Sequence, residues 1–247
     1  MLYIKKEGLC AELEQKIIEI RKSDIWNNID QKDTKSIRNI FDNVFPKDNV
    51  KEILIREQKG ICAYCMKRIR MDSHSRVEHW IPLSANKESA IDYNNLFGVC
   101  DGGEKIIAQE GHIVCCDANK KEMAITTNPL NEVQMKKIAY KPDGTIYTQP
   151  EDKVMEKDIN EILLLNGIRK ADGSVRDTST EILKGRRDAY DRARQMMDNL
   201  NRRGKCTSIS VKKIIDNLQN QKESEEFVGV KLYYFYKKYN ALVRRGL

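Results

Sequence analysis

Apolar residues in the first quarter of the chain recur at three- and four-residue intervals, which is the spacing of one face of a helix. This spacing predicts an amphipathic helix over residues 9–22, and related patterns predict helices over 33–44 and 48–57. We expect these helices to form an amino-terminal cap, residues 1–59, over the segment that follows.

The pattern changes in the middle of the chain. Residues 61–125 contain short β-type pieces separated by turn residues, which is typical of a small fold stabilised by metal instead of a large core. A β-hairpin is predicted over 138–147, with Asp143-Gly144 at its turn. We expect residues 60–150 to form one module.

Beyond Pro150 the pattern becomes helical again, with glycines at the predicted ends. A short polar run at 219–226 is predicted to be a flexible connection. We therefore expect an α+β protein whose last part, residues 151–247, is a helical subdomain. The helices predicted in this part cover residues 153–165, 178–203, 209–221 and 230–245.

Size and composition fit a folded globular protein. The chain has 247 residues, of which 40% are hydrophobic, enough for one large domain or two small ones. No apolar run approaches the roughly 20 residues that span a bilayer, and residues 1–6 lack the apolar segment of a signal peptide. We expect a cytoplasmic protein without a membrane partner. A net charge of +7 favours a polyanionic partner.

Cysteines gather in the middle module. A reducing cytoplasm disfavours disulfides, so clustered cysteines are better explained as metal ligands. Structural zinc takes four tetrahedral ligands, and a C-x-x-C turn lets two thiolates reach one ion. We expect Cys62 and Cys65 to form the first pair and Cys100 and Cys116 the second, if the glycine-rich loop between them folds back.

Two other residues compete for the last zinc position. Cys115 precedes Cys116 directly, and His112 lies just before both. Cys10 and Cys206 stand apart from the cluster and are expected to be small buried hydrophobes.

An acid and a histidine lie between the cysteine pairs. Hydrolysis of a phosphodiester needs a base for the attacking water and a cation that stabilises negative charge. A neutral His79 supplies the base, and carboxylates such as Glu78 and Asp117 hold a hard cation such as Mg²⁺. Adjacent strand residues point to opposite faces, so Glu78 and His79 share a site only if the backbone is bent or bulged. Asn95 is expected to hold the loop that carries His79 by amide hydrogen bonds.

At these residues the chain resembles the HNH endonucleases, also called ββα-metal nucleases. Glu78-His79, Asn95 and Asp117 stand where that family has its acid/His-His pair, its Asn and its final His or Asn. The sequence departs from the family pattern in its Glu, in the Asp that replaces the last His, and in a long insertion between the later cysteines. The resemblance implies a zinc-stabilised ββα-metal module that cleaves nucleic acid.

Further motifs resemble a narrower group, the PtuB-like nucleases of Septu and retron antiviral systems. The likeness is strongest from residue 60 to 131. It implies an effector that is restrained until phage infection and works with a PtuA-like ATPase, and in retrons with a reverse transcriptase and its RNA-DNA product. The motifs are Val77-Glu-His-Trp-Ile-Pro82, Cys100-Asp-Gly-Gly103, Cys116-Asp117 and Thr127-Asn-Pro-Leu130.

Related nucleases end their motif with Cys-His-x-x-Lys. This relation favours Cys116 over Cys115, because Asp117 and Lys120 then take the places of the His and the Lys. Cationic residues near the first cysteine pair, together with the final Lys, are predicted to bind nucleic acid. They are Lys67, Arg68, Arg70 and Lys120.

The sequence leaves the substrate and the role open between stated alternatives. DNA is expected from the wider family, and transfer RNA is the alternative, because the catalytic groups act on the phosphate. The rival role is a zinc-stabilised nucleic-acid-binding or scaffold subunit without catalysis, which the atypical Glu78 and Asp117 favour. An arginine-rich stretch at 186–203 fits either a phosphate backbone or a solvated helix face, and the aromatic-rich helix around 231–239 fits either core packing or partner docking.

Overall fold

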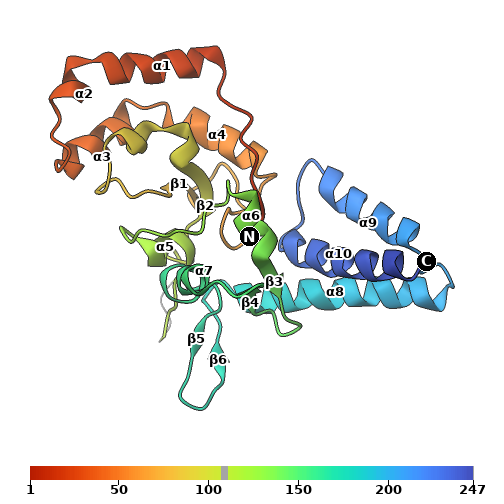
Figure 1. The fold of residues 1–247 in the computed structure, drawn as a ribbon. Helices are drawn as coiled ribbons and strands as arrows, with labels where there is room; N and C mark the ends of the chain where they lie inside the picture. The colour runs from red at the N-terminus through yellow and green to blue at the C-terminus, as the bar shows by residue number, and fades with distance from the viewer. Residues whose placement is uncertain (107–110, 247) are drawn as a thin grey trace.

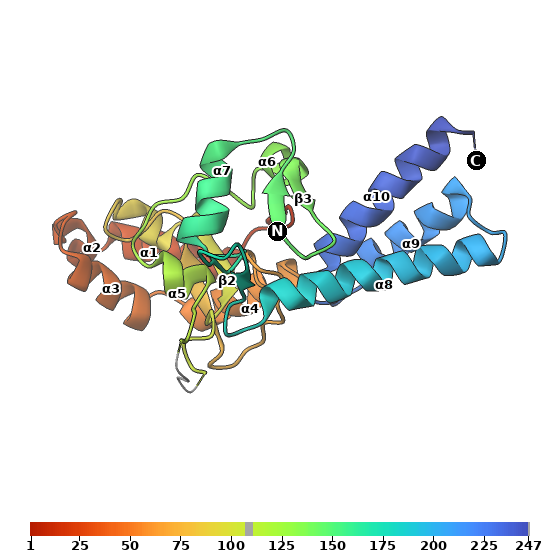
Figure 2. The same ribbon diagram turned by 90° about the horizontal axis from the view of Figure 1, so that it is seen from below.

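A computed structural model describes residues 1–106 and 111–246 of the chain. Helices gather at the two ends of an elongated molecule, and short antiparallel strand pairs lie between them (Figures 1 and 2). The predicted α+β class is confirmed. Among the described helices, none is both long and apolar enough to cross a bilayer.

The amino-terminal helices form where they were predicted, with one addition. A five-residue helix follows the first one and is too short to give a periodic signal; the Ser23 side chain caps it by accepting from the Trp26 backbone N–H. Asp33 caps the next helix in the same way. The helices are α1 (Ala11–Lys22), α2 (Asp24–Asn28), α3 (Thr34–Asn43) and α4 (Lys47–Glu57).

A two-stranded sheet and a short helix form the centre of the molecule. The strands β1 (Ser75–His79) and β2 (Leu96–Cys100) pair antiparallel, and the helix α5 (Cys116–Lys120) contacts β2. Two short 3₁₀ turns, η1 (Glu88–Ile91) and η2 (Tyr93–Asn95), lead into β2. The middle segment thus contains the short strands that its sequence predicts.

The predicted hairpin is present and is followed by a feature that the sequence did not indicate. The strands β3 and β4 pair across a turn at Asp143-Gly144, where Gly144 has a φ of +90°. The predicted helix 153–165 is instead one α-helical turn that passes into a π-helix, η3. The elements are α6 (Glu132–Lys137), β3 (Ile138–Tyr140), β4 (Ile146–Thr148), α7 (Lys153–Lys157) and η3 (Asp158–Ile162).

Three helices extend from the opposite end of the molecule (Figure 2). A short hairpin that sequence analysis missed, β5 and β6, precedes them and projects outward (Figure 1). The polar run 219–226, predicted to be a flexible connection, has a hydrogen bond to a distant segment: the Ser224 backbone N–H donates to the Lys59 carbonyl at 2.9 Å. The elements are β5 (Ile168–Arg169), β6 (Val175–Arg176), α8 (Ile182–Arg202), α9 (Ser208–Asn220) and α10 (Val228–Arg244).

Buried apolar residues form two clusters. One joins the amino-terminal helices to residues between β1 and β2, such as Leu83 and Ile91. The other joins the cysteine segment to the carboxyl-terminal helices, for example through Phe97 and Phe235. This second cluster continues across residue 150, and the predicted division into three parts remains a prediction.

Candidate metal centre and adjacent cleft

Four cysteines come together in the core. The Sγ atoms of Cys62, Cys65, Cys100 and Cys116 all lie within 4.8 Å of one another, and all four residues are buried. These are the four that the sequence singles out as zinc ligands. The loop after Cys100 therefore does return the chain to the first pair.

The sulfur spacing fits a tetrahedral ion better than a disulfide. Cys62 and Cys116 Sγ are 4.0 Å apart, and Cys65 and Cys100 Sγ are 3.6 Å apart. Sulfurs about 2.3 Å from a tetrahedral zinc lie roughly 3.8 Å from each other, whereas a disulfide bond is about 2.05 Å long. The cluster can hold a metal such as zinc.

The two competing ligands point elsewhere. Cys115 Sγ lies 3.7 Å from the Gly102 carbonyl and 3.5 Å from the Thr180 hydroxyl. His112 Nε2 lies 2.7 Å from the Gly103 carbonyl. The structure thus favours Cys116, whose Sγ lies with the other three and whose backbone is left-handed, with a φ of +54°.

The π-helix holds the segment that carries Cys116. The Cys116 N–H donates to the Leu163 carbonyl at 2.9 Å. Asn119 Nδ2 donates to the carbonyls of Glu161 and Ile162, each at 3.0 Å. The last carbonyls of a helix have no partner within it, and here α5 supplies donors for those at the end of η3.

A cleft of about 460 Å³ begins at Asp117, the residue that follows Cys116. Glu78, His79 and Asp117 all border it, together with Arg76 and Phe41. The strand has no bulge between Glu78 and His79, because β1 and β2 pair one-to-one from Ser75 to His79. Glu78 and His79 nevertheless border the same cleft, and His79 is the last residue of its strand.

His79 is buried against an aromatic ring and has one defined hydrogen bond. Its ring centroid is 4.4 Å from that of Phe41, and its Nε2 lies 3.0 Å from the Ala90 carbonyl. A carbonyl only accepts, so Nε2 carries the hydrogen and Nδ1 keeps a free lone pair. Burial lowers the pKa of His79 to about 4, and the ring is neutral at physiological pH.

Asn95 makes the loop contacts that its sequence position predicts. Its Oδ1 accepts from the Ile81 N–H at 2.7 Å, and its Nδ2 donates to the carbonyls of Ile81 and Ser89 at 3.0 and 2.9 Å. The amide therefore joins the chain after His79 to the turn that contains Ala90. Both segments that fix the imidazole depend on this one side chain.

Glu78 is bonded on two sides. Lys120 Nζ lies 2.7 Å from Glu78 Oε1, and the Tyr64 hydroxyl donates to the same oxygen at 3.3 Å. Tyr64 lies within the Cys62–Cys65 turn, so the metal knuckle contacts the carboxylate directly. Burial and the neighbouring Asp117 raise the pKa of Glu78 well above its usual range, although Lys120 opposes the change.

The carboxylates do not form a ready metal site with His79. Among the described residues, the four cysteines are the one set of three or more His, Cys, Asp or Glu ligands that converges closely enough for an ion. Asp117 Oδ2 is 3.3 Å from Arg76 Nη1 instead. Each of the two candidate cation ligands, Glu78 and Asp117, is therefore paired with a cationic side chain.

The cationic residues selected from the sequence are mostly engaged inside the protein. Lys120 is fully buried. Lys67 Nζ donates to the Thr180 carbonyl at 3.0 Å, and Arg68 donates to the carbonyls of Gly60 and Ser224. Arg70 is exposed. Nucleic acid could contact Lys120, Lys67 or Arg68 directly only if their contacts inside the protein were broken. Of these four residues, Arg70 is the one with an exposed side chain.

A series of hydrogen bonds from Asp158 to Trp80, which the sequence did not predict, also supports the site. Asp158 Oδ2 accepts from both the N–H and the hydroxyl of Thr126 and of Thr127, at 2.7 to 2.9 Å. The Thr127 carbonyl in turn accepts from Trp80 Nε1 at 3.0 Å. The Thr127 motif was visible in the sequence, but its partner Asp158 lies in a separate segment. This series of hydrogen bonds ends at Trp80, the residue that follows His79.

Scans of this chain against protein-family models and against curated proteins returned no match.

Proposed function

We propose that this chain is a zinc-stabilised, metal-dependent HNH endonuclease that hydrolyses phosphodiester bonds, with DNA as the expected substrate and transfer RNA as the alternative. The observation that supports it most is that Glu78, His79 and Asp117 border one cleft, and that Asp117 directly follows Cys116 of the cysteine cluster. Residues far apart in the sequence are thus gathered at one place.

In this proposal His79 accepts the proton of the attacking water through Nδ1. The bond to the Ala90 carbonyl fixes the ring and its tautomer, and Asn95 fixes the loops on both sides. A pKa of about 4 makes a weak base, but an anionic phosphate beside the ring favours the protonated form and raises that pKa.

Glu78 and Asp117 would hold the catalytic cation, Mg²⁺ or a similar ion, which would supply positive charge for the phosphate and the leaving oxygen. Both carboxylates have the oxygen chemistry that such ions prefer. Their present partners, Lys120 and Arg76, would share them with the cation or move away.

We further propose that the enzyme is the toxic effector of an antiviral defence system of the Septu or retron kind, with a PtuA-like ATPase and, in retrons, a reverse transcriptase with its RNA-DNA product. The motifs described above support this proposal. The outward helices α8, α9 and α10 offer the surface for such a partner (Figure 2). A cytoplasmic location follows from this role.

The test incubates the purified chain, with and without a co-expressed ATPase partner, with plasmid DNA and total transfer RNA in Mg²⁺. We expect cleavage that His79→Ala abolishes and that a chelator stops. His74→Ala is the matched control, because His74 is exposed and lies outside the cleft lining. Full cleavage by His79→Ala would refute the assignment.

One observation favours a second function, a zinc-stabilised nucleic-acid-binding or scaffold subunit without catalysis. Glu78 and Asp117 already have internal cationic partners in place of an open cation site. Binding of nucleic acid that needs no divalent cation, with no cleavage of either substrate, would support this function. Mg²⁺-dependent cleavage would exclude it.

A further inference from the structure

We propose that Arg76 binds the phosphate of the nucleic acid substrate in the cleft and that Glu104 restrains its guanidinium in the absence of substrate. The inference rests on the proposed function, since it names a substrate contact of the same site. Arg76 was not among the cationic residues that the sequence singled out.

The strand places Arg76 beside the candidate catalytic groups. Side chains two residues apart on a strand share one face, so Arg76 and Glu78 project from the same side of β1. Both border the cleft of about 460 Å³. A phosphate that reaches Glu78 therefore passes within reach of the guanidinium.

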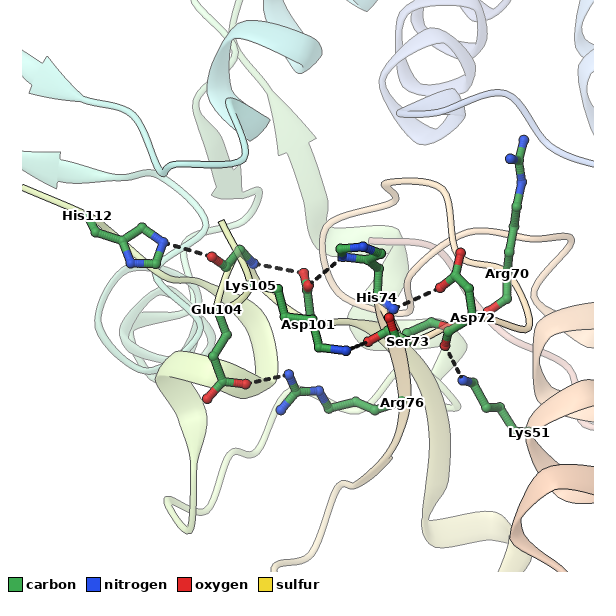
Figure 3. A network of polar contacts seen from close by, with 12 residues as sticks. Lys51, Arg70, Asp72, Ser73, His74, Arg76, Asp101, Glu104, Lys105 and His112 are labelled. Atoms are coloured by element: carbon green, nitrogen blue, oxygen red, sulfur yellow. Dashed lines mark hydrogen bonds and ion pairs between the residues drawn. The ribbon is translucent and has the colours of Figure 1, made fainter. Parts of the chain in front are cut away.

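Two carboxylates hold the guanidinium from different elements. Arg76 Nη1 lies 3.3 Å from Asp117 Oδ2 at the start of α5, and Nη2 lies 2.6 Å from Glu104 Oε2 in the loop after β2. Figure 3 shows the arginine extended toward Glu104. The Arg76 side chain is 33% exposed and the Glu104 side chain 59% exposed, so solvent and ligands reach this pair.

Access distinguishes Arg76 from Lys120. Of the residues that the structure describes, these two form the ion pairs with Glu78 and Asp117. The Lys120 side chain is 1% exposed and its ammonium also donates to the His79 carbonyl, so a substrate cannot touch it without opening the core. Of these two cations, Arg76 is the one that solvent and a substrate can reach.

The chemistry of the pair allows an exchange of partners. A planar guanidinium offers parallel N–H donors that match the oxygens of a phosphate. Ion pairs between exposed side chains are weak, so a phosphate anion can replace Glu104. A divalent cation on Asp117 would neutralise that carboxylate and leave Arg76 free for the same phosphate.

The test measures binding without cleavage. A fluorescent oligonucleotide is titrated with the full chain in a His79→Ala background, and anisotropy is followed at several salt concentrations. Arg76→Gln is expected to weaken binding about tenfold and to lower the salt slope by about one, as for the loss of one phosphate contact. Arg76→Lys keeps the charge, so its affinity should lie between those of the parent chain and Arg76→Gln. Glu104→Gln should bind a few-fold more tightly.

Lys16→Gln is the matched control. Lys16 is also exposed and paired with an acid, Glu12, but lies on α1 outside the cleft lining. If Arg76→Gln and Lys16→Gln behave alike, or if the parent chain binds no oligonucleotide, the inference is wrong. If Glu104→Gln binds the oligonucleotide more weakly than the parent chain or equally well, Glu104 does not restrain the Arg76 guanidinium. Circular dichroism verifies that each variant is folded.

Failure of the Arg76 contact can be distinguished from failure of the proposed nuclease function. Cleavage that depends on His79, with binding and KM unchanged in Arg76→Gln, overturns the phosphate contact and leaves the nuclease intact. No cleavage, with binding that still depends on Arg76, overturns the nuclease and leaves a nucleic-acid contact.

Discussion

Lys120 Nζ lies 2.7 Å from Glu78 Oε1, and both side chains are almost fully buried, with 1% and 6% of their surface exposed. The same ammonium donates to the His79 carbonyl at 2.9 Å. One lysine thus joins α5 to the last two residues of β1. The end of the strand that carries the candidate catalytic pair is held from the helix that carries Cys116 and Asp117.

Lys120→Met is therefore expected to destabilise the protein by about 3 to 5 kcal/mol, because it leaves a buried carboxylate without its countercharge. Urea unfolding followed by circular dichroism measures the free energy of unfolding. Lys121→Met is the matched control, since Lys121 is exposed and its loss should change that energy by less than about 0.5 kcal/mol. Equal effects of the two substitutions would mean that the buried pair contributes little.

The fate of Lys120 shows what sequence could not predict. Its spacing from Cys116 was visible, but whether the ammonium meets a phosphate or a carboxylate depends on where β1 lies, which is a tertiary fact. Arg76 was overlooked for the same reason, because neither Asp117 nor Glu104 is near it in sequence. The hydrogen bonds of Asn95 were predictable, because an amide side chain next to a turn can donate to and accept from the backbone at the same time.

Adjacent cysteines offer a sharp test of the metal centre. Cys116→Ser is expected to lower zinc content well below one ion per chain and to reduce the melting temperature, because a structural zinc site supplies folding energy. Cys115→Ser should keep both, since Cys115 Sγ faces the Gly102 carbonyl and Thr180. A colorimetric assay of zinc after denaturation, together with thermal melts, gives the answer.

Loss of zinc in Cys115→Ser with retention in Cys116→Ser would reverse the assignment. Chelation of the parent chain should reproduce the Cys116→Ser melting curve. The C-x-x-C turn made the first pair predictable, because its spacing alone fits an ion. Cys116 was predicted over Cys115 from its resemblance to the Cys-His-x-x-Lys ending, and the fold agrees, since Cys116 Sγ lies in the cluster and Cys115 Sγ faces the Gly102 carbonyl.

Asp158 is expected to support the site from a distance. Asp158→Ala removes the acceptor of the Thr126 and Thr127 donors, and we expect a loss of about 2 to 4 kcal/mol in the free energy of unfolding. Displacement of the Thr127 carbonyl should also loosen Trp80 and lower kcat more than it raises KM. Urea unfolding and cleavage kinetics measure the two effects.

Glu161→Ala is the control for this substitution, because Glu161 lies in the same π-helix and is exposed. Similar effects of both changes would point to the π-helix in general instead of the Asp158 carboxylate. The sequence could not predict this support, since a π-turn differs from an α-helix by one residue and leaves no pattern. The outer hairpin β5–β6 was missed because each strand has two residues.

Lys6 provides a prediction about pH that involves neither the metal centre nor the cleft. Its side chain is 9% exposed, and Nζ donates to the Leu96 carbonyl at 2.7 Å. Burial lowers the pKa of Lys6 to about 8, although Glu57 opposes the change. The unfolded chain, with a pKa near 10.5, then binds more protons than the folded chain between these two values.

The contribution of Lys6 to the free energy of unfolding should therefore rise as the pH increases from about 8 to 10.5, and this gain is lost as the pH falls through 8. The change is at most roughly 3 kcal/mol. Lys6→Met should lack this rise, because methionine fills the site without a charge at any pH. Urea unfolding of both chains at pH 7, 8, 9 and 10 isolates the effect, since all other titrating groups are shared. Lys5→Met, at an exposed neighbour, should follow the parent chain. Parallel curves for Lys6→Met and the parent would show that the Lys6 ammonium keeps its ordinary pKa in the folded protein.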